Sequence, residues 1–292
     1  MGSRLVWFIT GTSAGFGEAL TKIVLARGDR VIATARSLEK IQHLASTDCR
    51  TLQLDVTDEF PAIQAVAKAA VDVWGRVDVL VNNAGLGTAG ISEELGAAGY
   101  QKAFAVNVFS AINVTNALLP YMRAAKSGLV VLMGSRHAWK TQFPGISAYG
   151  STKAALHAWG EGLSSELKPF GVRVLIVQPG AHRTTILTTS HANPLGGQQL
   201  PDYEAMRQAG AKRYIDQNGK QPNDPVKAMT AVVDVIRGEG QAAGKPTPLW
   251  LVLGQDAEND LREHVKVRLE SLEEWKDITR SVAVDDDDVV LI

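Results

Sequence analysis

The chain has 292 residues, of which 45% are hydrophobic and 21% are charged, and its formal net charge is −1. This balance is ordinary for a globular protein and gives no sign of a nucleic-acid partner or of an anionic membrane surface. The single cysteine, Cys49, excludes an internal disulfide and fits a reducing compartment. No apolar run approaches the roughly 18 residues that cross a bilayer, and the first expected strand begins at Leu5, which leaves no room for a signal peptide. We therefore expect a cytoplasmic protein without a membrane partner.

Short apolar runs rich in β-forming residues alternate with helical patterns along most of the chain. Strands are expected at residues 5–10, 30–34, 51–54, 77–82, 129–134, 172–178 and 249–253, and helices at 17–27, 38–45, 60–74, 100–126, 147–168 and 225–238. Most strand runs are continuously apolar, which is typical of a parallel sheet buried on both faces. We predict a single α/β domain over residues 1–292. Its core would be a Rossmann-type, doubly wound parallel sheet of about seven strands with helices on both faces.

Two stretches depart from this alternation. Residues 185–224 are polar and rich in Gly, Pro and Gln, with one helical piece at about 203–216. They are too long for an ordinary connection, so we expect a substrate loop or lid. Residues 255–292 are expected to form a helical extension, with a charged helix at 256–275. We expect the acidic tail at 285–292 to be solvated or weakly docked.

The first expected strand runs directly into a glycine-rich turn, Thr10-Gly11-Thr12-Ser13-Ala14-Gly15-Phe16-Gly17. Glycine is required where the backbone takes a positive φ or lies against a ligand. Three glycines between a strand and a helix leave backbone N–H groups free at the helix N-terminus, where they and the helix dipole bind phosphate. We predict a dinucleotide pyrophosphate site formed by Gly11, Thr12, Ser13, Gly15, Phe16 and Gly17. The alternative is a glycine-rich turn without a ligand.

The end of the second strand indicates which nicotinamide cofactor would bind. An acidic residue here would accept hydrogen bonds from the adenosine ribose of NAD, but the chain reads Thr34-Ala35-Arg36-Ser37. Arg36, with Ser37 beside it, is suited to the 2′-phosphate of NADP. Alternatively, Arg36 is a surface residue at the start of the next helix. We predict NADP(H) as the cofactor.

Two further segments follow later strands. Asp55 and Val56 follow the third strand, where Asp55 would hold the adenine amino group or cap the next helix. Asn82-Asn83-Ala84-Gly85 closes the fourth strand, and such small residues suit either a close approach to a cofactor or a plain turn. We assign to the cofactor site Asp55, Val56, Asn83, Ala84 and Gly85.

The segment Ala148-Tyr149-Gly150-Ser151-Thr152-Lys153 carries candidate acid–base chemistry. Tyr149 and Lys153 are four residues apart, so they share one face of the expected helix. A phenol ordinarily ionises near pH ~10, and a nearby ammonium favours the phenolate. Lys153 is therefore expected to lower the pKa of Tyr149, so that the phenol exchanges a proton with an alcohol or a carbonyl near neutral pH.

Taken together, these motifs resemble the short-chain dehydrogenase/reductase family over residues 5–185, and more loosely to 255. The matching positions are residues 10–17, Asp55, residues 82–85, Asn107, Tyr149, Lys153 and residues 179–184. Within the family the chain is similar to 17β-hydroxysteroid-dehydrogenase-like reductases. It is also similar to many fungal enzymes of secondary metabolism, which share the Ala-Arg pair after the second strand. The resemblance implies hydride transfer between the nicotinamide and a carbonyl carbon.

The resemblance also implies residue roles. Tyr149 would be the general acid/base, and Lys153 would lower its pKa and hold the nicotinamide ribose. Asn107 would bend its helix and hold a water of a proton relay. The residues that would position the nicotinamide amide are Pro179, Gly180 and Thr184. Members of the family usually form homodimers or homotetramers through the two long helices, here 100–126 and 147–168.

One position departs from the family pattern. The catalytic serine of the family bonds the substrate oxygen and usually lies about 13 residues before the tyrosine, where this chain has Arg136; Ser135 lies 14 before it. A one-residue bulge between 136 and 143 would bring Ser135 into place, and we assign the catalytic role to Ser135. Alternatively, Arg136 replaces the serine as an oxyanion donor, or the site has drifted from carbonyl reduction. His137 would be an auxiliary donor or an exposed structural histidine.

The expected function is an NADP(H)-dependent oxidoreductase that interconverts a ketone and a secondary alcohol, without a metal. The loop at 185–224 suggests a substrate larger than a short-chain alcohol. Its residues Tyr203, Met206 and Tyr214 either line an apolar pocket or pack within the loop. Arg136 favours the alternative of an isomerase, dehydratase or cyclase that keeps NADP(H) bound. A non-catalytic NADP(H) sensor is disfavoured because Tyr149 and the lysine are both retained.

Overall fold

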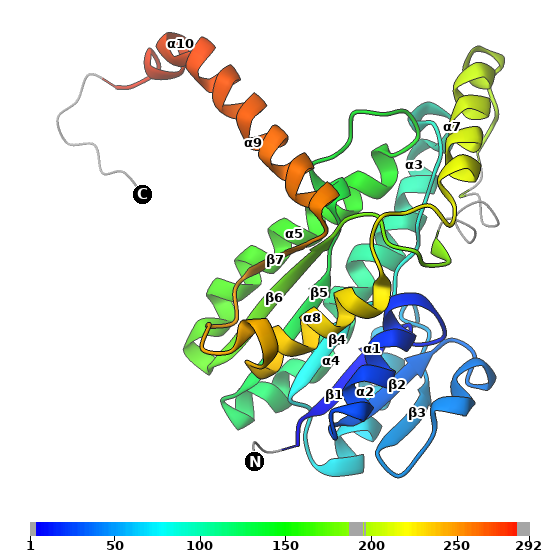
Figure 1. The fold of residues 1–292 in the computed structure, drawn as a ribbon, viewed down its shortest axis with the longest axis vertical. Helices are drawn as coiled ribbons and strands as arrows, with labels where there is room; N and C mark the ends of the chain where they lie inside the picture. The colour runs from blue at the N-terminus through cyan, green and yellow to red at the C-terminus, as the bar shows by residue number, and fades with distance from the viewer. Residues whose placement is uncertain (1–3, 187–194, 196, 285–292) are drawn as a thin grey trace.

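The computed structural model describes residues 4–186, 195 and 197–284. Seven parallel strands form one sheet: β1 (Val6–Thr10), β2 (Arg30–Ala35), β3 (Cys49–Gln53), β4 (Val79–Asn82), β5 (Gly128–Met133), β6 (Val172–Pro179) and β7 (Trp250–Leu253). Their spatial order is β3-β2-β1-β4-β5-β6-β7 (Figure 1). The chain order reverses between β1 and β4, and such a switch point leaves a crevice beyond the carboxyl ends of the strands. The predicted Rossmann-type sheet is confirmed.

Helices cover both faces of the sheet (Figure 1). One layer contains α1 (Gly15–Ala26), α8 (Pro225–Arg237) and the 3₁₀ helix η1 (Glu39–Leu44), and the other contains α2 (Phe60–Trp74), α4 (Ser110–Ala125) and α5 (Ser147–Leu167). The other described α-helices are α3 (Ser92–Phe104), α7 (Glu204–Gln217), α9 (Gln255–Glu274) and α10 (Lys276–Arg280).

Each helical layer buries its own apolar core against the sheet. Leu20 of α1 and Met229 of α8 belong to the core on one face, and Leu118 of α4 belongs to the core on the other. The neighbours Trp7 and Phe8 of β1 point into opposite cores and are 0% and 1% exposed. Burial on both faces is the reason that the strands are continuous apolar runs and do not alternate.

Two helices differ from the sequence expectation. The expected helix at 38–45 is only the 3₁₀ segment η1. The expected helix at 100–126 begins earlier, at Ser92, and its backbone widens into a π-helix, η2 (Ala105–Phe109), between α3 and α4. Asn107 lies at the centre of η2, and π-bulges of this kind are frequent at functional sites.

The helical stretch Ser92–Ala125 is long and apolar enough, by length and composition alone, to cross a membrane. Half of its most apolar window is buried inside the protein. Val114 and Leu118 on this stretch pack into the core beside the sheet. Helices of a protein core pass the same test, so the finding is weak evidence for a span.

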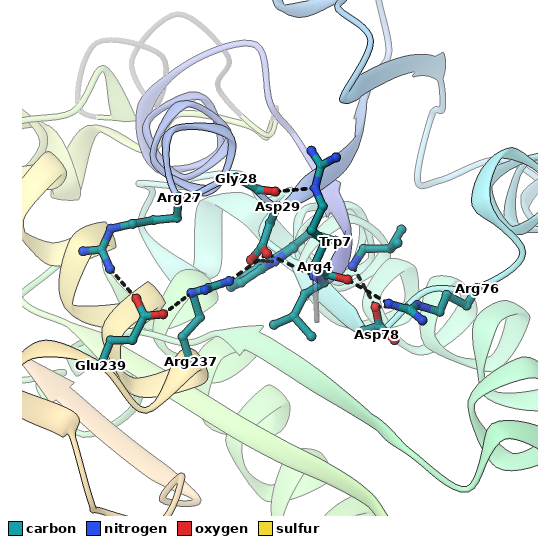
Figure 2. Close-up of polar contacts among 11 residues, drawn as sticks. Arg4, Trp7, Arg27, Gly28, Asp29, Arg76, Asp78, Arg237 and Glu239 are labelled. Carbon is teal, nitrogen blue, oxygen red and sulfur yellow. Dashed lines mark hydrogen bonds and ion pairs between the residues drawn. The ribbon is translucent and has the colours of Figure 1, made fainter. Parts of the chain in front are cut away.

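A buried carboxylate fastens the edge of the sheet where the strands begin (Figure 2). Asp29 is 1% exposed and accepts hydrogen bonds from the Leu5 backbone N–H, the Trp7 indole and the Arg237 guanidinium, at 3.0, 3.0 and 2.7 Å. Arg237 also donates to Glu239 at 2.7 Å. Because Arg237 and Trp7 both donate to Asp29, this carboxylate joins the end of α8 to β1. Breaking one partner of a buried ion pair costs about 3–5 kcal/mol. This cluster therefore stabilises the sheet at the end opposite the carboxyl-end crevice.

The segments that the sequence sets apart lie beyond the carboxyl ends of the strands (Figure 1). The helix α7 belongs to the described part of the expected lid, and α9 projects away from the body with Ala257 as its one buried residue. Residues 187–194 and 196 of the expected lid, and the acidic tail at 285–292, lie outside the described residues.

Candidate active site

A cavity of about 780 Å³ opens at the carboxyl ends of the strands. Ligand pockets usually have about 300–1,000 Å³, so the volume suits a cofactor with a small molecule. The predicted site residues that line it are Gly11, Ser13, Gly15, Phe16, Arg36, Asp55, Val56, Asn83, Ala84, Gly85, Ser135, Tyr149, Lys153, Pro179, Gly180 and Thr184. Four predicted residues lie outside the lining, namely Thr12, Gly17, Ser37 and Asn107.

The glycine-rich turn depends on its glycines for different reasons. Gly11 and Gly15 have φ of +70° and +60°, where a side chain would be strained. A Cβ on Gly17 would lie 2.3 Å from the Gly11 carbonyl oxygen, so Gly17 allows α1 to pack against the turn and does not itself reach the cavity. Thr12 is also buried, and its hydroxyl donates to the Thr34 carbonyl at 3.2 Å. Both residues therefore shape the turn from behind.

The N-terminus of α1 faces the cavity without a side-chain cap. Its N-cap residue is Ala14, which has no polar side chain. The residues that line the cavity at this point are Ser13, Ala14, Gly15 and Phe16. Uncapped N–H groups and the positive end of the helix dipole make an anion site. The turn therefore fits the phosphates of a nicotinamide dinucleotide.

The ends of β2 and β3 form the wall of the cavity nearest Arg36, whose side chain is exposed. Asp55 faces its own loop, where its Oδ1 accepts the Thr57 backbone N–H at 2.9 Å and the Thr57 hydroxyl at 2.7 Å. Burial acts to raise the pKa of Asp55, but the Thr57 bonds and the Arg36 charge hold it below its usual value. Glu59 is the N-cap residue of α2, so Asp55 is not the cap.

The turn after β4 is bonded to the glycine-rich turn. Asn83 Nδ2 donates to the carbonyl oxygens of Thr10 and Gly11 at 2.8 and 3.1 Å. Thr10 Oγ1 in return accepts the backbone N–H groups of Asn83 and Ala84 at 3.0 and 2.9 Å. These bonds hold together the two turns that flank the switch point of the sheet.

Tyr149, Ser135 and Lys153 meet inside the cavity. The helix α5 carries the tyrosine and the lysine one turn apart, and β5 leads into Ser135. Ser135 acts to lower the pKa of the Tyr149 phenol as a hydrogen-bonding side chain. The Ser135 Oγ accepts the His137 backbone N–H at 3.1 Å. Lys153 Nζ donates to the Met133 carbonyl at 2.7 Å and lies 5.7 Å from the centroid of the Tyr149 ring. The structure thus brings three of the four predicted catalytic residues together.

Burial dominates the electrostatics of the tyrosine and the lysine. It raises the pKa of Tyr149 to about 12, although the bond from Ser135 acts in the opposite direction. It lowers the pKa of Lys153 to about 8. The expectation that Lys153 brings the Tyr149 pKa below its ordinary value is therefore wrong for this structure, because desolvation outweighs any attraction from the ammonium. At neutral pH the phenol is protonated.

Arg136 is engaged by two carboxylates of α9. Its Nη1 lies 2.7 Å from Asp256 Oδ2 and 3.0 Å from Asp260 Oδ2. A short 3₁₀ turn, η3 (Arg136–Ala138), follows Ser135. Ser135 and Arg136 both line the cavity with Tyr149, and Ser135 is the one that acts on the pKa of the phenol.

Sequence reasoning missed His157, which supports the serine. This residue is 6% exposed, and its Nε2 accepts the Ser135 backbone N–H at 3.3 Å. A Cβ on Gly134 would lie 2.2 Å from that nitrogen, so glycine is required there. Burial, and then the charge of Lys153, lower the pKa of His157 to about 4, which keeps the ring a neutral acceptor. The one available signal was its position four residues after the lysine, on the same face of α5.

Asn107 is buried behind the lining of the cavity. Its Oδ1 accepts the Leu86 backbone N–H at 2.7 Å. Its Nδ2 donates to the Leu86 carbonyl at 2.9 Å and to Thr152 Oγ1 at 3.1 Å. The amide therefore ties η2 to the loop after β4 and to α5, while its role in a water relay stays a prediction.

The loop after β6 is held by Asp256, which sequence motifs did not single out. Asp256 Oδ2 accepts the Ala181 backbone N–H at 2.7 Å, and Oδ1 accepts Asn223 Nδ2 at 2.7 Å. A Cβ on Gly180 would lie 2.2 Å from Asp256 Oδ1, so this glycine allows the carboxylate to approach the loop. Asp256 therefore joins three segments: the turn after β5 through Arg136, the loop after β6 through Ala181, and the segment after α7 through Asn223.

The far end of the cavity contains aromatic side chains. The ring centroid of His137 lies 5.4 Å from Phe143 and 5.8 Å from Tyr149. Burial lowers the pKa of His137 to about 4, which corrects the expectation of an exposed histidine. Its Nδ1 lies 2.9 Å from the Lys140 carbonyl and must be the donor, which leaves Nε2 as an acceptor.

The helix α7 closes this end of the cavity from the side of the lid. Its Arg213 lies over the Phe143 ring, 4.3 Å from the centroid. Met206 and Tyr214 line the cavity, as one sequence interpretation proposed. Tyr203 is outside the lining and donates to Glu93 at 2.7 Å.

Comparison with known proteins agrees with this geometry. Residues 5–194 match the family model described as short chain dehydrogenase. The oxidoreductase BOA17 of Botryotinia fuckeliana (strain B05.10) is 32% identical over 282 residues, which cover 95% of this chain and 99% of that protein. A short-chain dehydrogenase of known structure from Streptomyces avermitilis is 38% identical with a TM-score of 0.83, over 97% of this chain and 100% of that chain. Less similar solved structures include complexes with NADP and with NAD. The chain belongs to the short-chain dehydrogenase family.

Proposed function

We propose that the protein is an NADP(H)-dependent oxidoreductase that interconverts a small-molecule ketone and a secondary alcohol. The observation that carries the proposal is that Ser135 and Tyr149 line one cavity together with the glycine-rich turn. Lys153 lines the same cavity, with its ammonium bonded to the backbone of β5. Membership of an oxidoreductase family supports the class of reaction.

The residues along the cavity fit a nicotinamide dinucleotide. The uncapped N–H groups at the start of α1 would hold its pyrophosphate, and Arg36 would hold a 2′-phosphate. Asp55 and Val56 would contact the adenine. The nicotinamide would lie against Pro179, Gly180 and Thr184. When bound, the cofactor supplies or accepts a hydride.

Tyr149 is suited to move the proton that accompanies the hydride. Because burial raises its pKa to about 12, the phenol is protonated at neutral pH and can donate to a carbonyl oxygen. Ser135 is positioned to bond the same oxygen, since its Oγ is fixed by the His137 N–H. In the direction of oxidation, the phenol would first lose its own proton, and the phenolate would then receive the proton of the alcohol.

Turnover tests this assignment. NADPH and a panel of aromatic and cyclic ketones would be mixed with the wild-type protein and with Tyr149→Phe, and cofactor and product would both be quantified. We expect NADPH loss to match alcohol formation, and Tyr149→Phe to lower kcat by about 10²–10⁴-fold, the usual worth of a general acid. Product formed without NADPH consumption would instead support the isomerase, dehydratase or cyclase alternative. The contact of Arg136 with Asp256 supports the reductase over that alternative, which rests on Arg136.

Cofactor preference is tested by titration of the protein with NADPH and with NADH. We expect NADPH to bind at least about tenfold more tightly, a difference of about 1.4 kcal/mol. Arg36→Ala should weaken NADPH binding and leave NADH binding unchanged. The exposed Lys40→Ala, which is also basic but lies outside the cavity lining, is the matched control. Equal affinities in the wild-type protein would refute the NADP(H) preference.

Assembly as a homodimer or homotetramer through the long helices remains part of the proposal. The exposed side chains of Phe109, in η2, and Tyr121, on α4, support it, being 55% and 37% exposed. Phe109→Glu should lower the mass measured by sedimentation equilibrium. An unchanged mass would place the contact elsewhere.

A further inference from the structure

A second cavity of about 290 Å³ lies beside the N-terminus of α1. Its lining consists of Gly15, Arg183, Thr184, Thr185, Asn218, Gly219 and Gln221. One wall is therefore the glycine-rich turn, and the other combines the loop after β6 with the residues that follow α7. The main cavity shares with it Gly15, Thr184, Thr185 and Gln221, so the two volumes adjoin.

Gln221 is the unusual member of this lining. Its side chain is 5% exposed, and neither Oε1 nor Nε2 has a hydrogen-bond partner among the described residues. Most buried polar groups in native proteins are paired, because leaving one unpaired is unfavourable. An unpartnered amide at the wall of a cavity therefore points to a ligand with polar atoms of its own.

Hydrogen bonds hold the backbone around Gln221 in place, and they therefore fix the position from which its amide side chain extends. The Gln221 carbonyl accepts Arg183 Nε at 2.8 Å, and the Arg183 backbone N–H donates to the Asn223 carbonyl at 3.0 Å. His182 and Asn223 also form a β-bridge. These contacts attach the segment that follows α7 to the loop after β6, which the sequence motif assigns to the nicotinamide.

The chemistry of the second cavity suits an anion with several acceptor oxygens. Arg183 contributes a positive charge, and the uncapped start of α1 at Gly15 contributes backbone donors. The Gln221 amide adds a neutral donor. No acidic residue is among the described lining residues. Phosphate oxygens match this set of groups better than an apolar or cationic group would.

We propose that Gln221 and Arg183 form the outer half of the pyrophosphate site and bind the cofactor phosphates from the side opposite the glycine-rich turn. This inference rests on the proposed use of NADP(H). It assigns a direct cofactor contact to Gln221, which follows α7, and to Arg183, within the motif that ends at Thr184. Binding of the cofactor would then pair an amide that has no partner among the described residues.

The test is a fluorescence titration of the full-length protein with NADPH. Gln221→Leu and Arg183→Met are each expected to raise the Kd about tenfold or more, and the exposed neighbour Lys220→Met should change it less than about twofold. Thermal unfolding without ligand provides a second readout. Gln221→Leu should be at least as stable as the wild-type protein, because an apolar side chain replaces an unpaired buried amide. Weaker binding with unchanged stability would separate a lost contact from misfolding.

Two cofactor fragments distinguish the phosphates. 2′-Phospho-ADP-ribose contains the pyrophosphate and should lose affinity in both variants, whereas adenosine 2′-monophosphate lacks it and should not. Equal losses for both fragments, or an unchanged Kd for NADPH in Gln221→Leu and Arg183→Met, would overturn the site. If the wild-type protein bound neither NADPH nor NADH, the proposed function itself would fail and this site with it.

Discussion

The Nη1 atom of Arg136 lies 2.7 Å from Oδ2 of Asp256 and joins the turn after β5 to the first turn of α9. The same carboxylate oxygen accepts the Ala181 backbone N–H at 2.7 Å, from the loop after β6. The two charged side chains are only 20% and 21% exposed, so this pair is less screened by solvent than a surface pair. Arg136, which the family spacing places at the position of the catalytic serine, is therefore paired with Asp256.

The first prediction separates Ser135 from Arg136. Ser135→Ala should lower kcat by about 10²–10³-fold, the usual effect of removing an oxyanion donor, because Ser135 acts on the Tyr149 phenol whereas Arg136 is paired with Asp256. Arg136→Ala should keep kcat within about tenfold of the wild-type value. Steady-state kinetics at saturating NADPH would measure both. The opposite ranking would make Arg136 the oxyanion donor.

The second prediction concerns Asp256. Asp256→Ala should lower the free energy of unfolding by about 2–3 kcal/mol, because it leaves the Arg136 charge and the Ala181 N–H without their partner. Urea unfolding at pH 7 would measure this, with the exposed Glu270→Gln on α9 as a control that should be near neutral. A loss no larger than that of the control would show that the carboxylate does not hold these loops.

The same residue predicts a pH dependence. Burial acts to raise the pKa of Asp256, but the Ala181, Asn223 and Arg136 contacts hold it below its usual value. A carboxyl group whose pKa is lowered in the folded state stabilises the fold at pH values above its unfolded pKa of about 4. This stabilisation is lost as the pH falls below that value. The stability gap between the wild-type protein and Asp256→Asn should therefore narrow below about pH 4. A constant gap would contradict an ionised Asp256.

The third prediction is that Lys153 costs stability. Burial lowers its pKa to about 8, which at neutral pH corresponds to a penalty of roughly 3 kcal/mol, partly offset by about 1 kcal/mol from its bond to Met133. Lys153→Met should therefore abolish turnover but raise stability at pH 7 by about 1–2 kcal/mol. Because the unfolded chain binds more protons between about pH 8 and 10.5, the stability of the wild-type protein should rise with pH across that window and the gain should disappear. Denaturant unfolding of both proteins at pH 7 and pH 10 would measure this difference. A Lys153→Met variant that is less stable than the wild-type protein at pH 7 would contradict the prediction.

The fourth prediction compares alanine substitutions of two helical glycines, Gly17 in α1 and Gly162 in α5. Gly17→Ala should disrupt the glycine-rich turn, because its Cβ would lie 2.3 Å from the Gly11 carbonyl oxygen and 2.6 Å from Asn83 Nδ2. We expect a loss of about 1–3 kcal/mol in stability together with loss of NADPH binding. Gly162→Ala in α5 is the control, since its Cβ would meet nothing within 4 Å and alanine favours a helix by about 0.5–1 kcal/mol. Calorimetry and cofactor titration of both variants would show whether the effect is specific to the turn.

Local sequence was sufficient for the fold and for much of the site. Continuously apolar runs predicted a parallel sheet because burial on two faces leaves no polar side, and the glycine spacing predicted the turn after β1 because only glycine adopts its backbone. Tyr149 and Lys153 were recognisable because four residues make one helical turn, and the structure places both in the same cavity. Each of these signals lies within a few neighbouring residues.

The tertiary structure decided what depends on residues far apart in the chain. Arg136 and Asp256 are separated by 120 positions, so no local pattern could show that the arginine is paired and that Ser135 reaches the phenol. The pKa of Tyr149 likewise follows from its burial, which outweighed the effect expected from the neighbouring lysine. Only the folded chain shows that the Gln221 amide is buried without a partner among the described residues, beside the loop after β6. Sequence periodicity records which residues lie on one face of one element, whereas desolvation and ion pairing are set by how separate elements pack together.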